Sequence, residues 1–535
     1  MKNFTNFGVM VDMSRNAVMS LDGLKKFIPL ISKMGYDCLF LYMEDTYEVD
    51  GEPYIGYLRG RYSKDEMKEL DRFALSHGIE VIPCIQTLAH LSRIFRWDQY
   101  PMDNEDILMA DDERTYQLVD NMFATLNECF STRRLHVGMD EAHGLGRGKH
   151  LDRHGYETVD VIMKRHLGRV TELAEKYGYE IMIWSDMFFR PWNNGNYAIP
   201  ATTIPEEYVK ALPSCVAPVY WDYYSDNANH YRDMMSNHRQ LSKKTWFAGG
   251  AWTWGGFLPH NKFSIKTMTP AISMAKQEKI KQIFITMWGD NGGECSRFAV
   301  LPALFYIIQL AKGVTDEEKI KARFKSAFGV AFDDFMLLDG PNDFEPSEAR
   351  MGVPVNPAKY MLYNDYFVGA YDYTVADGGY EHFAENERLL SATAKKSRKY
   401  GHIFDTAAKL SAVLKYKYDL GVKTRNAYQN GDKAELTRLA NEEYTYTVKA
   451  ISAFARAFEK QWHLENKPHG FEVHDVRLGG LIRRTESCRR RLLDYACGKI
   501  DSIPELEDQL LPHGDEKKSI YANMYRDLVT PSDLG

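Results

Sequence analysis

Short apolar runs alternate with longer amphipathic stretches from Phe7 to about Gly289. The runs are rich in Val, Ile, Phe and Met, as in the buried strands of a parallel sheet, and the stretches between them repeat apolar residues at helical spacing. Eight runs occur, and they begin at Phe7, Cys38, Glu80, Leu135, Glu180, Cys215, Thr245 and Gln282. Eight strand–helix units in roughly 300 residues predict one closed (β/α)8 barrel.

The pattern changes after about Gly313. Three long segments, 380–430, 433–460 and 478–499, repeat apolar residues at helical spacing and contain few β-branched runs. We therefore predict an α/β chain with a (β/α)8 TIM barrel at residues 1–313, followed by a mostly α-helical C-terminal domain at residues 314–535.

The composition of the chain argues against several classes of protein. Apolar residues make up 44% of the chain and charged residues 26%, with a net charge of -7, which is typical of a globular protein and does not indicate a nucleic-acid partner. No apolar stretch has the length of a signal peptide or of a membrane span. The seven cysteines are scattered without a CxxC pair and indicate reduced thiols. We expect a cytoplasmic protein with no membrane partner.

Polar and aromatic residues follow the apolar runs, at the carboxyl ends of the predicted strands, where barrels of this kind carry their active sites. They are Asp12 to Arg15, Glu44 and Asp45, His90, Asp140 and Glu141, Trp184 to Asp186, Trp221 to Tyr224, Trp252 to Trp254, and Trp288 to Asp290. Five of the nine tryptophans are among them. Aromatic walls combined with charged groups predict a cavity for a sugar ring.

The segment LHVGMDEAHGLGRG ends an apolar strand in two adjacent carboxylates, Asp140 and Glu141. In a shared, partly desolvated site one acid stays protonated near neutrality while its neighbour stays ionised. This favours Glu141 as a general acid and Asp140 as a stabiliser of positive charge, although the pair alone would also fit a structural or metal-binding role. A metal cluster with His136 and His143 is disfavoured because the HxGxD spacing suits no standard zinc site. We expect no metal and no cofactor.

The sequence resembles glycoside hydrolase family 20, the β-N-acetylhexosaminidases, across most of the barrel. HVGMDEAH is similar to the family's HxGxDE motif, with Asp140 and Glu141 at its acidic pair. VDMSR, LYMEDT, the turn LAH, IWSD and MWGD are similar to its other strand-end motifs, in the same order. The resemblance implies that Arg15 binds ring hydroxyls and that Asp45 is the acidic partner of His90. The implied walls and substrate contacts are Trp184, Trp221, Trp252, Trp254, Trp288 and Asp290.

Two motifs depart from the family. Asp290 stands where glutamate is common, and the family's Tyr-x-Asp has no clear counterpart in AWTWGG. We predict that Tyr223 holds the acetamide oxygen instead, because it lies two residues after Trp221 and faces the same side if the strand continues. The barrel begins near Met1, so the amino-terminal α/β domain of many members is not expected.

The resemblance implies an exo-β-N-acetylhexosaminidase that acts by substrate-assisted retaining hydrolysis on small oligosaccharides or glycoconjugates with terminal β-linked GlcNAc or GalNAc. A homodimer is one candidate oligomeric state. Two alternatives stay open. One is an ordinary two-carboxylate retaining β-glycosidase with Asp186, Asp222 or Asp290 as nucleophile, and the other is a carbohydrate-binding protein without turnover.

Overall fold

The computed structural model of the chain describes residues 4–344, 353–511 and 522–534. The chain forms two compact units, each built from several segments. The first comprises Met1–Ala251, Ser264–Met287 and Ala303–Asp316, and the second comprises Trp252–Phe263, Trp288–Pro302 and Glu317–Gly535. A division into domains at residue 313 stays a prediction.

The first unit contains a closed barrel of eight parallel strands in the order β1-β10-β9-β8-β7-β6-β3-β2. The strands are β1 (Asn6–Asp12), β2 (Cys38–Glu44), β3 (Glu80–Ile85), β6 (Arg134–His136), β7 (Glu180–Trp184), β8 (Ala217–Trp221), β9 (Trp246–Gly250) and β10 (Gln282–Met287). Each apolar run of the sequence overlaps one of them. The (β/α)8 prediction is therefore confirmed.

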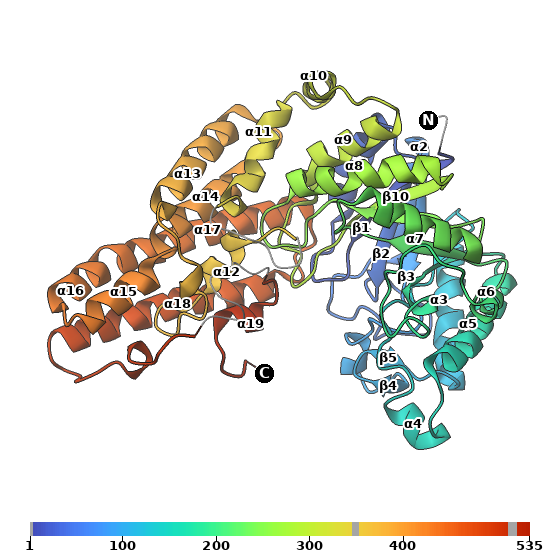
Figure 1. Ribbon diagram of the computed structural model, residues 1–535, viewed down its shortest axis with the longest axis horizontal. Coiled ribbons are helices and arrows are strands. Elements are labelled where there is room, and N and C mark those ends of the chain that lie inside the picture. Colours follow the sequence, from blue (N-terminus) through green and yellow to red (C-terminus); the bar gives the residue numbers. More distant parts are fainter. Residues whose placement is uncertain (1–3, 345–352, 512–521, 535) are drawn as a thin grey trace. The chain divides into compact units, whose positions relative to one another are not determined.

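The helices that connect the strands lie outside the barrel, and α4 among them lies beside the β4 segment, Met102–Asn104 (Figure 1). They are α1 (Leu21–Met34), α2 (Lys64–Ser76), α3 (Glu113–Cys129), α4 (Lys149–His154), α5 (Val159–Lys176), α6 (Glu206–Ala211), α7 (Ala228–Leu241), α8 (Asn261–Gln277) and α9 (Leu301–Ala311). Helix α2 begins with a capping box, in which the Ser63 side chain accepts from the Glu66 N–H and the Glu66 carboxylate accepts from the Ser63 N–H. Local sequence thus determines where this helix begins.

A short antiparallel hairpin, β4 (Met102–Asn104) and β5 (Ile107–Leu108), lies between β3 and α3 in the chain. The sequence analysis did not predict it. Strand β6 is only three residues long, because the backbone after it turns into the left-handed region at Gly138 and Met139. Both features shape the carboxyl end of the barrel.

The second unit is helical, as predicted. Its helices are α10 (Glu317–Phe328), α11 (Phe332–Met336), α12 (Pro357–Tyr363), α13 (Gly379–Lys396), α14 (Gly401–Lys417), α15 (Leu420–Gln429), α16 (Lys433–Asn441), α17 (Glu443–Glu465), α18 (Phe471–Ala496) and α19 (Tyr525–Val529). Helix α14 packs against α13 and α17, and α18 packs against α17 and α16. None of the helices formed by the described residues has both the length and the apolar composition needed to cross a bilayer.

Candidate active site

Four residues at or just beyond the carboxyl ends of the neighbouring strands β2, β3 and β6 have left-handed backbones. Glu44 has a φ of 47°, His90 of 56°, Met139 of 68° and Glu141 of 52°. They are four of the ten non-glycine residues with positive φ in the part of the chain that the structure describes. This conformation is unfavourable for side chains other than glycine, and such strain concentrates at functional sites. The backbone thus singles out this corner of the barrel.

Asp140, Glu141 and His90 come together at this corner. The Nε2 atom of His90 lies 3.2 Å from Oδ2 of Asp140 and 3.7 Å from Oε2 of Glu141. The Asp140 side chain is 12% exposed, whereas that of Glu141 is 42% exposed. One imidazole therefore contacts both acids of the pair, one of them buried and the other open to solvent.

The two acids differ in their electrostatic surroundings. Burial alone would raise the pKa of Asp140, but the charge of His90, a hydrogen bond from Gln86 and the charge of Arg15 outweigh burial and lower it. Partial burial, together with the neighbouring Asp140 charge, raises the pKa of Glu141. Although burial lowers the pKa of His90, the contact with Asp140 raises it well above the usual value. The site therefore favours an ionised Asp140 and a charged His90, and it shifts Glu141 toward its protonated form.

Gln86, which the sequence analysis did not select, connects this cluster to the neighbouring strands. Its Nε2 donates to Oδ1 of Asp140 at 2.7 Å and to the Tyr42 hydroxyl at 2.9 Å, while its Oε1 accepts from the Met139 N–H at 3.0 Å. The side chain is fully buried. A Cβ on Gly138 would lie 2.0 Å from Oε1 of Gln86, so glycine is required there. Gln86 therefore fixes both the side chain of Asp140 and the backbone before it.

Asp186 holds the backbone of Glu141. Its Oδ2 accepts from the Glu141 N–H at 3.1 Å and from Nε of Arg190 at 3.1 Å. The residue is fully buried, and its Oδ1 accepts no hydrogen bond from the residues that the structure describes. Burial and the charge of Asp140 raise the pKa of Asp186. The carboxylate thus ties the end of β7 to the strained turn at Glu141.

Arg15 lies beside the same cluster. Its guanidinium pairs with Oδ2 of Asp12 at 3.3 Å and with Oε1 of Glu44 at 3.5 Å, and it stacks over the Tyr42 ring at 4.6 Å. The Tyr42 hydroxyl donates to Glu44 at 3.0 Å. A continuous chain of contacts therefore runs from Arg15 through Tyr42 and Gln86 to Asp140.

Asp45 does not have the partner that the resemblance implied. Its carboxylate accepts from Nε of Arg59 at 3.0 Å, and the carboxylates in contact with His90 are those of Asp140 and Glu141. The loop after β2 brings Arg59 back over Asp45, since Gly56 in that loop packs against the Asp45 carbonyl. Asp45 therefore positions a loop at the mouth of the barrel.

The predicted aromatic walls of the first unit are Trp184, Trp221 and Tyr223. Trp184 is 1% exposed and packs on His136, with ring centroids 4.4 Å apart. Strand β8 ends at Trp221, so the strand alternation expected to place Tyr223 does not extend to it. The two rings nevertheless stack, with centroids 5.7 Å apart and planes 21° apart. Tyr223 thus lies beside Trp221 through ring stacking.

The other predicted residues, Trp252, Trp254, Trp288 and Asp290, belong to the second unit. Trp252 and Trp254 stack on each other at 4.4 Å, and the carbonyl of Trp288 accepts from Nη1 of Arg297 at 2.9 Å. They follow β9 and β10 directly in the chain. Their place in the wall of one common pocket stays a prediction.

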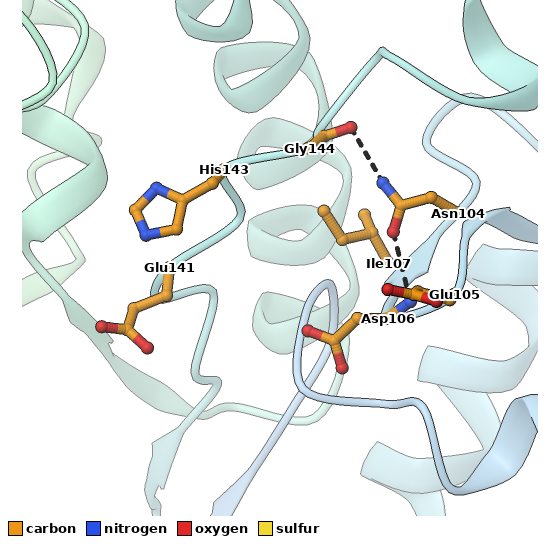
Figure 2. Close-up of a pocket in the computed structure, with 7 residues that line it drawn as sticks. All are labelled: Asn104, Glu105, Asp106, Ile107, Glu141, His143 and Gly144. Carbon is orange, nitrogen blue, oxygen red and sulfur yellow. Dashed lines mark hydrogen bonds between the residues drawn. The ribbon is translucent and has the colours of Figure 1, made fainter. Parts of the chain in front are cut away.

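A cavity of about 480 Å³ lies beside Glu141. Glu141, His143 and Gly144 form one side, and residues 104–107 of the β4–β5 hairpin form the other (Figure 2). Its volume falls in the range of small-molecule sites. A ligand in this cavity would therefore lie next to the more exposed acid of the pair.

Among the described residues, Asp111, His150 and Glu157 form a group that could hold a metal ion, with donor atoms within 4.8 Å of one another. Arg165 already pairs with both carboxylates, at 2.5 Å to Asp111 and 2.7 Å to Glu157. A guanidinium between two carboxylates supplies the positive charge that a cation would bring. This group is therefore explained as a salt-bridge cluster.

Comparisons with known proteins match two parts of the chain. Residues 4–204 match the catalytic domain of glycosyl hydrolase family 20, and residues 333–524 match the glycoside hydrolase 20C C-terminal domain. Human hexosaminidase D is 23% identical over 333 residues, which cover 58% of this chain and 66% of that protein. Bovine hexosaminidase D is 22% identical over 338 residues, which cover 58% of this chain and 92% of that protein.

A solved structure is also similar. The exo-β-N-acetylglucosaminidase of family 20 from Vibrio harveyi is 14% identical to the chain, with a TM-score of 0.47, and the match covers 63% of this chain and 58% of that one.

Proposed function

Because the chain belongs to glycoside hydrolase family 20, we propose that it is an exo-β-N-acetylhexosaminidase that releases terminal β-linked GlcNAc or GalNAc from glycans. The observation that carries this proposal is the pair Asp140 and Glu141 with His90 between them. Their surroundings shift the two carboxyl groups in opposite directions, because the pKa of Asp140 is lowered and that of Glu141 is raised. Retaining hydrolysis with help from the substrate needs one acid of each kind.

In the first step the substrate's acetamide oxygen bonds to C1 while the bond from C1 to the leaving oxygen breaks. Glu141 gives its proton to that oxygen, and Asp140 accepts a hydrogen bond from the acetamide N–H and offsets its growing positive charge. Water then attacks C1, its proton returns to Glu141, and the bond from C1 to the acetamide oxygen breaks. Two inversions at C1 leave its configuration unchanged.

The contacts of two of the three other candidate carboxylates, Asp186 and Asp222, support this scheme over one in which either of them is the nucleophile. Asp186 is fully buried and holds the Glu141 N–H and Arg190. Asp222 accepts from the Tyr224 N–H at 2.9 Å and pairs with His230 at 2.8 Å. Both are engaged in holding the local structure, whereas a nucleophile has to reach C1.

The remaining residues complete the proposal. Arg15 would bind ring hydroxyls, and Trp184, Trp221 and Tyr223 would enclose the acetamide. Trp252, Trp254, Trp288 and Asp290 would contact the sugar from the segments after β9 and β10.

The direct test measures kcat/KM for the nitrophenyl β-glycosides of GlcNAc, GalNAc and glucose. We expect cleavage of one or both N-acetylated substrates, no comparable cleavage of the glucoside, and inhibition by a thiazoline that mimics the cyclic intermediate. Equal cleavage of the glucoside would favour a two-carboxylate glycosidase, and no cleavage of any substrate would favour a binding protein.

A cytoplasmic location and a homodimer belong to the same proposal. All seven cysteines are free thiols and five of them are buried, which fits a reducing compartment. Cell fractionation tests the location, and light scattering coupled to size-exclusion chromatography tests the dimer.

A further inference from the structure

The β4–β5 hairpin forms one wall of the cavity beside Glu141. Asn104 donates from Nδ2 to the Gly144 carbonyl at 2.9 Å (Figure 2). The buried carboxylate of Asp103 accepts from the N–H groups of Gly146 at 2.7 Å and His150 at 2.8 Å. The hairpin and the loop that follows Glu141 are therefore joined by both side chains, which gives the cavity fixed walls.

The same hairpin also holds the loop that carries His90. Oδ2 of Asp106 accepts from the His90 N–H at 3.1 Å, and its Oδ1 accepts from the Ser92 N–H at 3.3 Å. The loop that carries His90 and the loop that follows Glu141 are thus both hydrogen-bonded to one short hairpin. A ligand in the cavity would meet a wall that is fixed relative to Glu141.

The lining of the cavity is acidic. Three of its seven residues, Glu105, Asp106 and Glu141, carry carboxyl groups, and none is lysine or arginine. Asn104 and His143 supply further hydrogen-bonding groups, and Ile107 supplies an apolar contact. An anionic group of a ligand would be repelled by these carboxylates. Hydroxyl and ammonium groups would instead donate hydrogen bonds to them.

We propose that this cavity is the leaving-group subsite and that Glu105 and Asp106 select glycans whose penultimate unit is neutral or positively charged. This inference rests on the proposed function. Glu141 protonates the oxygen that joins the terminal sugar to the leaving group, so the leaving group has to lie beside Glu141. The cavity lies there, and its carboxylates disfavour a uronic acid, a sulfated sugar or a phosphorylated sugar.

The test compares three disaccharides with a terminal β-linked GlcNAc, whose reducing units are GlcNAc, glucosamine and glucuronic acid. At a pH of about 6 these units are neutral, cationic and anionic. We expect kcat/KM for the anionic disaccharide to be about tenfold below that for the neutral one. The cationic disaccharide is expected to be cleaved at least as well as the neutral one.

The variant Glu105→Gln should raise the ratio of kcat/KM for the anionic disaccharide to kcat/KM for the neutral one about threefold. Glu105 suits this test because Asp106 also holds the His90 loop. Glu175→Gln is the matched control, since it removes the same charge from the exposed surface of α5. We expect this control to leave the ratio between the disaccharides unchanged.

Three results are informative in different ways. An anionic disaccharide cleaved as fast as the neutral one would overturn the inference, as would an unchanged preference in Glu105→Gln. If the wild-type protein failed to cleave nitrophenyl β-GlcNAc at all, the proposed function itself would fail. The nitrophenyl substrate therefore separates the two failures.

Discussion

Replacing Gln86 with methionine tests whether its hydrogen bonds hold the acidic pair. Methionine is close to glutamine in length and volume, so the change removes three hydrogen bonds and leaves little cavity. The Met139 N–H would lose its acceptor inside the barrel, at a cost of about 1–3 kcal/mol. Asp140 would lose a hydrogen bond to a charged group, worth about 1.5–3 kcal/mol. We expect the free energy of unfolding to fall by about 3–5 kcal/mol.

The same substitution should impair the reaction. Asp140 would keep its contact with His90 but lose the bond that orients its other oxygen, and a misplacement of about 1 Å can cost a hundredfold in rate. The Gln86 hydrogen bond lowers the pKa of Asp140, so its removal raises that pKa and moves the acid limb of the pH profile to higher pH. Denaturant unfolding and kcat/KM for nitrophenyl β-GlcNAc measure the two effects.

Tyr42→Phe is the control, because it removes the hydroxyl that accepts from Gln86 and donates to Glu44, and it leaves the bonds of Gln86 to Asp140 and Met139 intact. We expect a loss of about 1 kcal/mol and a small change in rate. A Gln86→Met variant that unfolded within 1 kcal/mol of the wild type and kept its kcat/KM within a factor of about three would refute the reasoning.

Three further variants probe other contacts. Glu141→Gln should lower kcat/KM about a hundred- to ten thousandfold for substrates with poor leaving groups, and less for nitrophenyl glycosides; equal losses on both would contradict general acid catalysis. Asp186→Asn removes a negative charge that raises the pKa of Glu141, so the basic limb of the pH profile should move to lower pH; an unchanged limb would argue against this coupling. Glu294→Gln removes the carboxylate that lies 2.7 Å from the buried Lys359 and neutralises its charge, while the hydrogen bond from Lys359 to Asn523 remains. We expect unfolding to become about 3–5 kcal/mol easier by calorimetry; a stability change within 1 kcal/mol would contradict this.

The barrel could be predicted from the sequence because its strands are buried on both faces. Strands β1, β2 and β10 are apolar along almost their whole length, and such runs, separated by amphipathic helices, leave few alternatives. The hairpin β4–β5 could not be predicted in this way. Its strands contain three and two residues, too few for a period to appear, and distant residues hold it in place.

The sequence could predict which residues of the candidate site follow the ends of strands. It could not predict which side chains the fold brings into contact with one another. Asp140 and Glu141 are adjacent acids after an apolar run, and the resemblance of HVGMDEAH to a family motif singled them out. Gln86 looks like any polar residue at a strand end, and only the fold shows that it touches three groups at once. Asp45 was assigned a partner by resemblance, and the return of its own loop gave it Arg59 instead.

At Glu44, His90, Met139 and Glu141 the left-handed backbone lowers the stability of the fold at the same positions that shape the candidate site. Each such residue costs about 1 kcal/mol that glycine would not. A selection for heat resistance would therefore favour glycine at these positions, and turnover would fall because the side chains of the site are lost. Efforts to harden the molecule should instead begin on the outer helices, where a better cap or surface charge leaves the strained corner untouched.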